Sequence, residues 1–121
     1  MYQPRIRTAQ PRRHYAFGQY RATFYDQIVS EGRIGYEFVI AVFDNLSKEP
    51  VFFVTSERGA EEGVYFLCTF DEERHSNFGD SPKWADAAIF EPEALERISK
   101  RLMSKPQLLW EREQFGESHK V

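Results

Sequence analysis

Cysteine, long apolar runs and a secretory leader are scarce or missing in this chain, and each absence limits what the protein can be. The single cysteine, Cys68, excludes an internal disulfide and favours a reducing compartment. No apolar run approaches the roughly 20 residues needed to span a bilayer. No apolar segment follows the first residues, as a leader would require. We therefore expect a soluble cytoplasmic protein.

Local signatures of catalysis are also missing. The chain contains no Gly-x-Ser-x-Gly, no Cys-x-x-Cys and no glycine-rich phosphate loop. Its 121 residues suit one domain with a single core, and a short chain without low-complexity tracts is typical of a bacterial protein. We expect neither catalysis nor a cofactor.

Aromatic residues supply most of the apolar mass, with 11 Phe and 6 Tyr, which favours a sheet-rich core. Apolar segments separated by turn-forming residues predict an antiparallel sheet of about four strands. We place these strands at roughly 17–29, 35–44, 50–56 and 63–70. Cys68 lies inside the last strand, where we expect a small buried hydrophobic side chain.

Two helix starts follow the predicted strands. Ser81-Pro82 has the form of an N-cap with proline in the first turn, and Pro92 marks a second start, which predicts helices at roughly 82–89 and 92–105. Leu95, Ile98 and Leu102 form an apolar stripe on the second helix. The sequence thus predicts a two-layer α+β domain over residues 15–110 with a polar tail at 111–121. A small closed barrel with one appended helix is the structural alternative.

Charge is distributed unevenly, although the net charge is only −3. Residues 1–25 carry +5 and no acid, and the remainder carries −8. We interpret residues 1–14 as a basic flexible arm. An alternative function is nucleic-acid binding, with sheet aromatics stacking bases and arginines contacting phosphates, although the acidic body opposes it. The arginines concerned are Arg5, Arg7, Arg12, Arg13 and Arg21.

The polar stretch 71–80 is expected to be a long surface loop and is the best candidate for chemistry. An enzyme or metal-binding alternative uses His75 for acid–base catalysis, with Asp71 and Asp80 as orienting groups or metal ligands. The spacing matches neither an EF-hand loop nor a zinc signature. A charged surface connection explains the same composition.

A non-catalytic protein-binding or assembly module is the leading hypothesis, because the composition provides a core and an acidic surface without a reactive constellation. Such a surface can capture a basic protein partner by electrostatic complementarity. Self-association into a homodimer through an edge strand or a sheet face is the related hypothesis. The candidate partner-binding residues are Glu57, Glu61, Glu62, Asp71, Glu72, Glu73, Arg74, His75 and Asn77.

Overall fold

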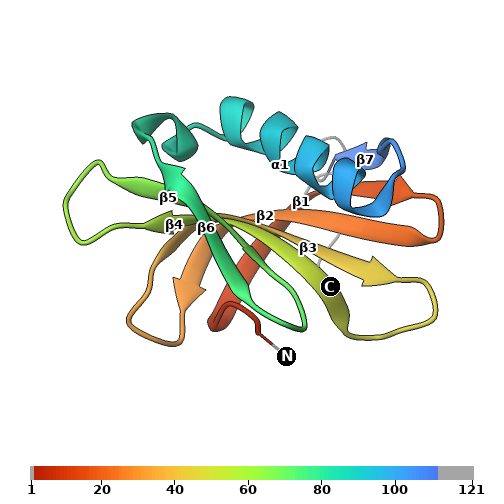
Figure 1. Ribbon diagram of the computed structural model, residues 1–121, viewed down its shortest axis with the longest axis horizontal. Coiled ribbons are helices and arrows are strands. Elements are labelled where there is room, and N and C mark those ends of the chain that lie inside the picture. The colour runs from red at the N-terminus through yellow and green to blue at the C-terminus, as the bar shows by residue number, and fades with distance from the viewer. Residues whose placement is uncertain (1, 112–121) are drawn as a thin grey trace.

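Seven β-strands form one antiparallel sheet in the computed structural model, which describes residues 2–111. The sheet order is β6-β5-β4-β3-β2-β1-β7, so the first six strands form a meander and β7 returns to pair with β1. The helix α1 lies across one face of the strongly twisted sheet (Figure 1). The strands are β1 Ile6–Phe17, β2 Tyr20–Ser30, β3 Tyr36–Asp44, β4 Pro50–Arg58, β5 Tyr65–Phe70, β6 His75–Asp80 and β7 Gln107–Glu111.

The central strand β3 is buried on both faces, because its even-numbered and its odd-numbered residues, which point to opposite faces of the sheet, are both mostly apolar. Phe38, Ile40 and Val42 belong to the core under the helix, whereas Val39 and Ala41 belong to a second core on the other face. A strand covered on both sides needs this continuous apolar run. The sheet therefore separates two cores.

The helical layer consists of a 3-10 turn, η1 Pro82–Ala85, followed by α1 Ala87–Leu102. The Ser81 hydroxyl accepts a hydrogen bond from the Lys83 backbone N–H, and the Asp86 carboxylate accepts one from Ala88. These caps satisfy backbone donors that a helix start leaves free. Along α1 every fourth residue from Phe90, namely Phe90, Ala94 and Ile98, is fully buried against the sheet.

The second core is covered by the twisted sheet itself and by the N-terminal segment. Tyr2 N–H donates to the Asp71 carbonyl at 3.3 Å, and Glu31 N–H donates to the Arg5 carbonyl at 2.9 Å, so residues 2–5 cross this face. Pro4 is buried, and Ile6 packs against the second core. The two cores together enclose most of the apolar mass on both sides of one sheet.

The expected fold of about four strands with several C-terminal helices is wrong, because residues 2–111 are mostly sheet, with seven strands and a single α-helix. Strand β1 contains most of the segment interpreted as a flexible arm. Two of its arginines have acidic partners, since Arg12 lies 2.7 Å from Asp26 and Arg13 lies 2.8 Å from Glu91. Pro11 is tolerated beside a register shift, outside the part of β1 that pairs with β7.

The expected surface loop at 71–80 is also wrong in part, because His75–Asp80 is strand β6. This strand is the edge of the sheet and is largely exposed. Hydrogen bonds to β5 hold it in place, so its sequence does not have to alternate between apolar and polar residues. The second helix start at Pro92 is wrong too, because Pro92 lies inside α1. Asp86 starts that helix as its N-cap. No helix among the described residues is long and apolar enough to cross a membrane.

Candidate functional site

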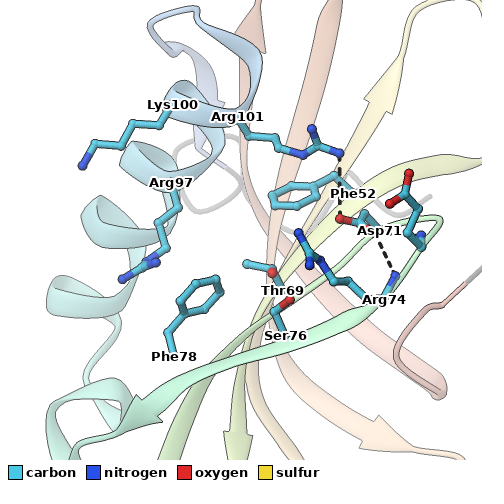
Figure 2. Close-up of a pocket in the computed structure, with 10 residues that line it drawn as sticks. Phe52, Thr69, Asp71, Arg74, Ser76, Phe78, Arg97, Lys100 and Arg101 are labelled. Carbon is cyan, nitrogen blue, oxygen red and sulfur yellow. Dashed lines mark hydrogen bonds and ion pairs between the residues drawn. The ribbon is translucent and has the colours of Figure 1, made fainter.

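A cleft of about 510 Å³ lies between α1 and the β5–β6 hairpin, on the helix-covered side of the sheet. Figure 2 shows its side chains arriving from the helix on one side and from the sheet and the β5–β6 turn on the other. The lining residues are Phe52, Thr69, Asp71, Glu73, Arg74, Ser76, Phe78, Arg97, Lys100 and Arg101.

Two aromatic rings and two hydroxyl residues form the sheet side of the cleft. Thr69 and Ser76 are cross-strand partners on β5 and β6, so both present small polar side chains at one level. Phe78 is 51% exposed, and the Arg97 guanidinium carbon lies 4.4 Å from its ring centroid. Such a cation–π contact orients the arginine. The sheet therefore offers an accessible flat apolar surface beside hydroxyl groups.

Four cations and two carboxylates line the cleft. Arg97 pairs with Glu93 at 3.1 Å and Lys100 with Glu96 at 3.3 Å, each one turn away on α1. Arg101 lies 3.8 Å from Asp71. Exposed pairs of this kind contribute only about 0.3–0.5 kcal/mol each, so a ligand anion could compete for the cations. Within residues 2–111, the Arg74 guanidinium makes neither a hydrogen bond nor an ion pair.

Asp71 holds the turn that presents Arg74. Its Oδ1 accepts hydrogen bonds from the backbone N–H groups of Glu73 at 2.8 Å and Arg74 at 2.9 Å. These bonds, with smaller contributions from the charges of Arg101 and Arg74, hold the pKa of Asp71 below its ordinary value. The carboxylate is thus committed to the backbone of the turn, and Figure 2 shows the Arg74 side chain extending from this turn toward Phe52 and Arg101.

Replacing Asp71 by alanine should cost about 1 kcal/mol of folding stability, as the loss of other side-chain caps does. Asp71→Asn retains an acceptor oxygen without the titrating charge. Because the folded pKa is lowered, the wild-type advantage over Asp71→Asn should be present above the unfolded pKa and should disappear as the pH falls through the folded value. Urea unfolding at about pH 7 and about pH 2 measures both effects. An equal difference in unfolding free energy between wild type and Asp71→Asn at the two pH values would contradict a lowered pKa of Asp71 in the folded state.

A second polar cluster lies on the opposite face of the sheet. One carboxylate oxygen of Glu57, the sulfur of Cys68 and one imidazole nitrogen of His75 lie within 4.8 Å of one another. Burial raises the pKa of Cys68 to about 12, with a further contribution from the Glu57 charge. Burial and the same charge raise the pKa of Tyr36 to about 12. The His75 ring stacks on Phe70 with centroids 4.2 Å apart.

The acidic residues predicted to bind a partner are not brought together. The exposed Glu61 and Glu62 lie in the β4–β5 connection, and Glu72 and Glu73 lie in the β5–β6 turn at the other end of β5. Asn77 lies on β6, where its side chain accepts a hydrogen bond from the Gly79 backbone. Capture of a basic protein by these segments stays a prediction.

The residues of the enzyme alternative are also separated. His75 begins β6 and Asp80 ends it, so an extended strand lies between them. Asp71 is held by backbone N–H groups of the turn. His75 instead meets Glu57 and Cys68, two residues that the sequence does not connect with it.

The N-terminal arginines of the nucleic-acid alternative are mostly engaged with the protein itself. Besides the pairs of Arg12 and Arg13, Arg5 contacts Glu31 at 3.4 Å and Arg21 contacts Asn45 at 3.3 Å. Arg7 is exposed on β1. Nucleic-acid binding through these residues stays a prediction.

Sequence reasoning did not connect Arg97, Lys100 and Arg101 with Arg74 or Phe78. Their spacing of three and four residues on one side of α1 is a usable signal, because such residues are neighbours on a helix surface. The aromatic partners could not be found this way. They depend on the unpredicted strand β6.

Comparison of the chain with protein-family models, with curated proteins and with solved structures finds no match. The fold and the cleft therefore define the protein by architecture alone. Over residues 2–111 this architecture is one antiparallel sheet with a covering helix, and the cationic cleft lies at the edge of that helix.

Proposed function

We propose that the protein is a non-catalytic binding protein that takes a small anionic ligand with a flat apolar part in the cleft between α1 and the β5–β6 hairpin. The observation that carries this proposal is the Arg74 guanidinium, which lines the cleft with three further cations and, within residues 2–111, lies within ion-pair distance of no acid, although the Asp71 charge attracts it from farther away. A carboxylate or phosphate group is the ligand chemistry that such a cluster recognises.

The size and the lining of the cleft support this ligand class. A volume of about 510 Å³ lies within the range of roughly 300–1,000 Å³ that small-molecule sites occupy. The exposed ring of Phe78 can stack on a planar group of the ligand while the arginines bind its anionic end. Thr69 and Ser76 add hydroxyl groups that can donate to the same oxygens.

The lining residues favour binding over catalysis. They include no histidine or cysteine, and the Asp71 carboxylate already accepts two backbone hydrogen bonds. General acid–base work needs a group free to exchange a proton with the substrate. Besides the carboxylates of Asp71 and Glu73, the cleft offers cations, hydroxyls and aromatic faces, which bind an anion without exchanging protons at neutral pH.

Isothermal titration with phenyl phosphate tests the proposal, with inorganic phosphate and phenol as probes of its two halves. We expect phenyl phosphate to bind more tightly than either probe. Arg74→Gln should weaken binding by about tenfold or more, because a hydrogen bond to a charged group contributes about 1.5–3 kcal/mol. Arg33→Gln is the matched control, since Arg33 is exposed at the β2–β3 connection outside the cleft. Equal affinity of Arg74→Gln and Arg33→Gln, or no binding of phenyl phosphate, would refute this function.

A further inference from the structure

We propose that Glu57, Cys68 and His75 form a binding site for a zinc ion, independent of the cleft. The three potential ligand atoms already lie within 4.8 Å of one another. They are a carboxylate oxygen, a thiol sulfur and an imidazole nitrogen, which are the three kinds of protein ligand that zinc takes. Harder cations such as Mg²⁺ and Ca²⁺ prefer oxygen ligands alone.

The register of three adjacent strands brings these residues together. Glu57 on β4 pairs with Phe66 on β5, and Cys68 follows two residues later, on the same face of the sheet. His75 on β6 pairs with Phe70, again two residues from Cys68. Side chains at such diagonal positions are within reach of each other when they are long. Glu57 and His75 therefore converge over the short side chain of Cys68 from both sides.

The electrostatics of the cluster favour a bound cation. Glu57 Oε2 is buried and lies 3.3 Å from His75 Nε2 without a well-formed hydrogen bond to that atom, while the Cys68 thiol donates to the Glu57 carboxylate. A buried carboxylate oxygen without a donor is costly. Cys68 is 0% exposed beside it. A divalent ion would neutralise the carboxylate and would bind the thiolate, whose proton passes to solvent.

The site has an entry path and an open position. The His75 side chain is 35% exposed, so an ion can reach the imidazole from solvent and then the two inner ligands. Three protein ligands leave one position of a tetrahedral zinc ion for water. This cluster faces the second core, whereas the cleft lies under the helix, so neither proposal depends on the other.

Titration with Co²⁺, followed by competition with Zn²⁺, tests the site in the full chain. A cobalt–thiolate charge-transfer band should appear in the near ultraviolet at one ion per chain, and Zn²⁺ should abolish it. About one proton per ion should be released. Cys68→Ser should remove the band. His75→Gln should weaken metal affinity more than about 100-fold, because losses at the outer-shell partners of metal ligands already cost roughly 10- to 100-fold.

His14→Gln is the control, since His14 lies on β1 beside Thr23 and outside the cluster. It should bind cobalt as the wild type does. Cys68 is a core residue, so circular dichroism must first show that Cys68→Ser is folded before the loss of its cobalt band is interpreted. If Cys68→Ser does not fold, the metal affinity of His75→Gln tests the site instead, because His75 lies on the exposed edge strand. A cobalt complex without a thiolate band, or unchanged affinity in His75→Gln, would overturn the proposal.

Discussion

Replacing Phe90 by alanine should remove about 3–5 kcal/mol of folding stability, the usual cost of truncating a buried phenylalanine. Phe90 is 0% exposed and is the largest side chain that α1 buries fully against the sheet. Its ring centroid lies 5.4 Å from that of Phe38 and 6.3 Å from that of Phe24. The truncation leaves a cavity between helix and sheet that these rigid rings cannot fill by small movements.

The measurement is the free energy of unfolding from urea denaturation of wild type and variant, compared at equal m-values. Ile89→Ala is a matched control, because Ile89 precedes Phe90 on the same helix but is 42% exposed. Its cost should stay near the roughly 0.5 kcal/mol of an ordinary surface substitution. Similar losses in the two variants would show that α1 does not pack on the sheet through Phe90.

Replacing Glu91 by alanine is the second substitution with a large expected effect, about 2–4 kcal/mol. Glu91 is a buried acid on α1, and both its oxygens are used by β1. Oε1 accepts from Arg13 at 2.8 Å, and Oε2 accepts from the Tyr15 hydroxyl at 2.5 Å. Removing one member of a buried pair costs about 3–5 kcal/mol, and we lower the range because Arg13 is partly exposed.

A double-mutant cycle of Glu91→Ala and Tyr15→Phe separates this contact from the loss of helix packing. Because the two side chains are hydrogen-bonded, the cycle should return a coupling energy of about 0.5–3 kcal/mol. Glu93→Ala is the control on the same helix, since its pair with Arg97 is about one-third exposed and should contribute about 0.5 kcal/mol or less. A coupling energy of zero would show that the Tyr15–Glu91 bond adds nothing to the docking of α1.

The sequence predicted only single residues of the cleft and of the Glu57–Cys68–His75 cluster, and it did not predict how they group. Asp71, Arg74 and His75 were selected from a polar stretch, yet the structure divides them between the cleft and the opposite face of the sheet. Cys68 was expected to be a buried side chain, and it is buried. Its proximity to Glu57 and His75 had no local signal, because the three residues meet only through the pairing of β4, β5 and β6.

The sequence by itself determined features that depend on neighbours along the chain. Apolar runs bounded by turn residues gave the segments of β3, β4 and β5 their strand character, and Ser81-Pro82 started the 3-10 turn. The apolar stripe of α1 faces the sheet, with Ile98 fully buried. These properties are local, because side-chain periodicity and capping act over a few residues.

Tertiary structure alone decided the parts that lack such a pattern. The basic β1 and the polar β6 become strands because neighbouring strands supply hydrogen bonds, and because acids distant in sequence neutralise Arg12 and Arg13 of β1. The same long-range pairing buries Glu91 under its partners and creates both the cationic cleft and the Glu57–Cys68–His75 cluster. Strand register is a contact between distant segments, so no local period encodes it.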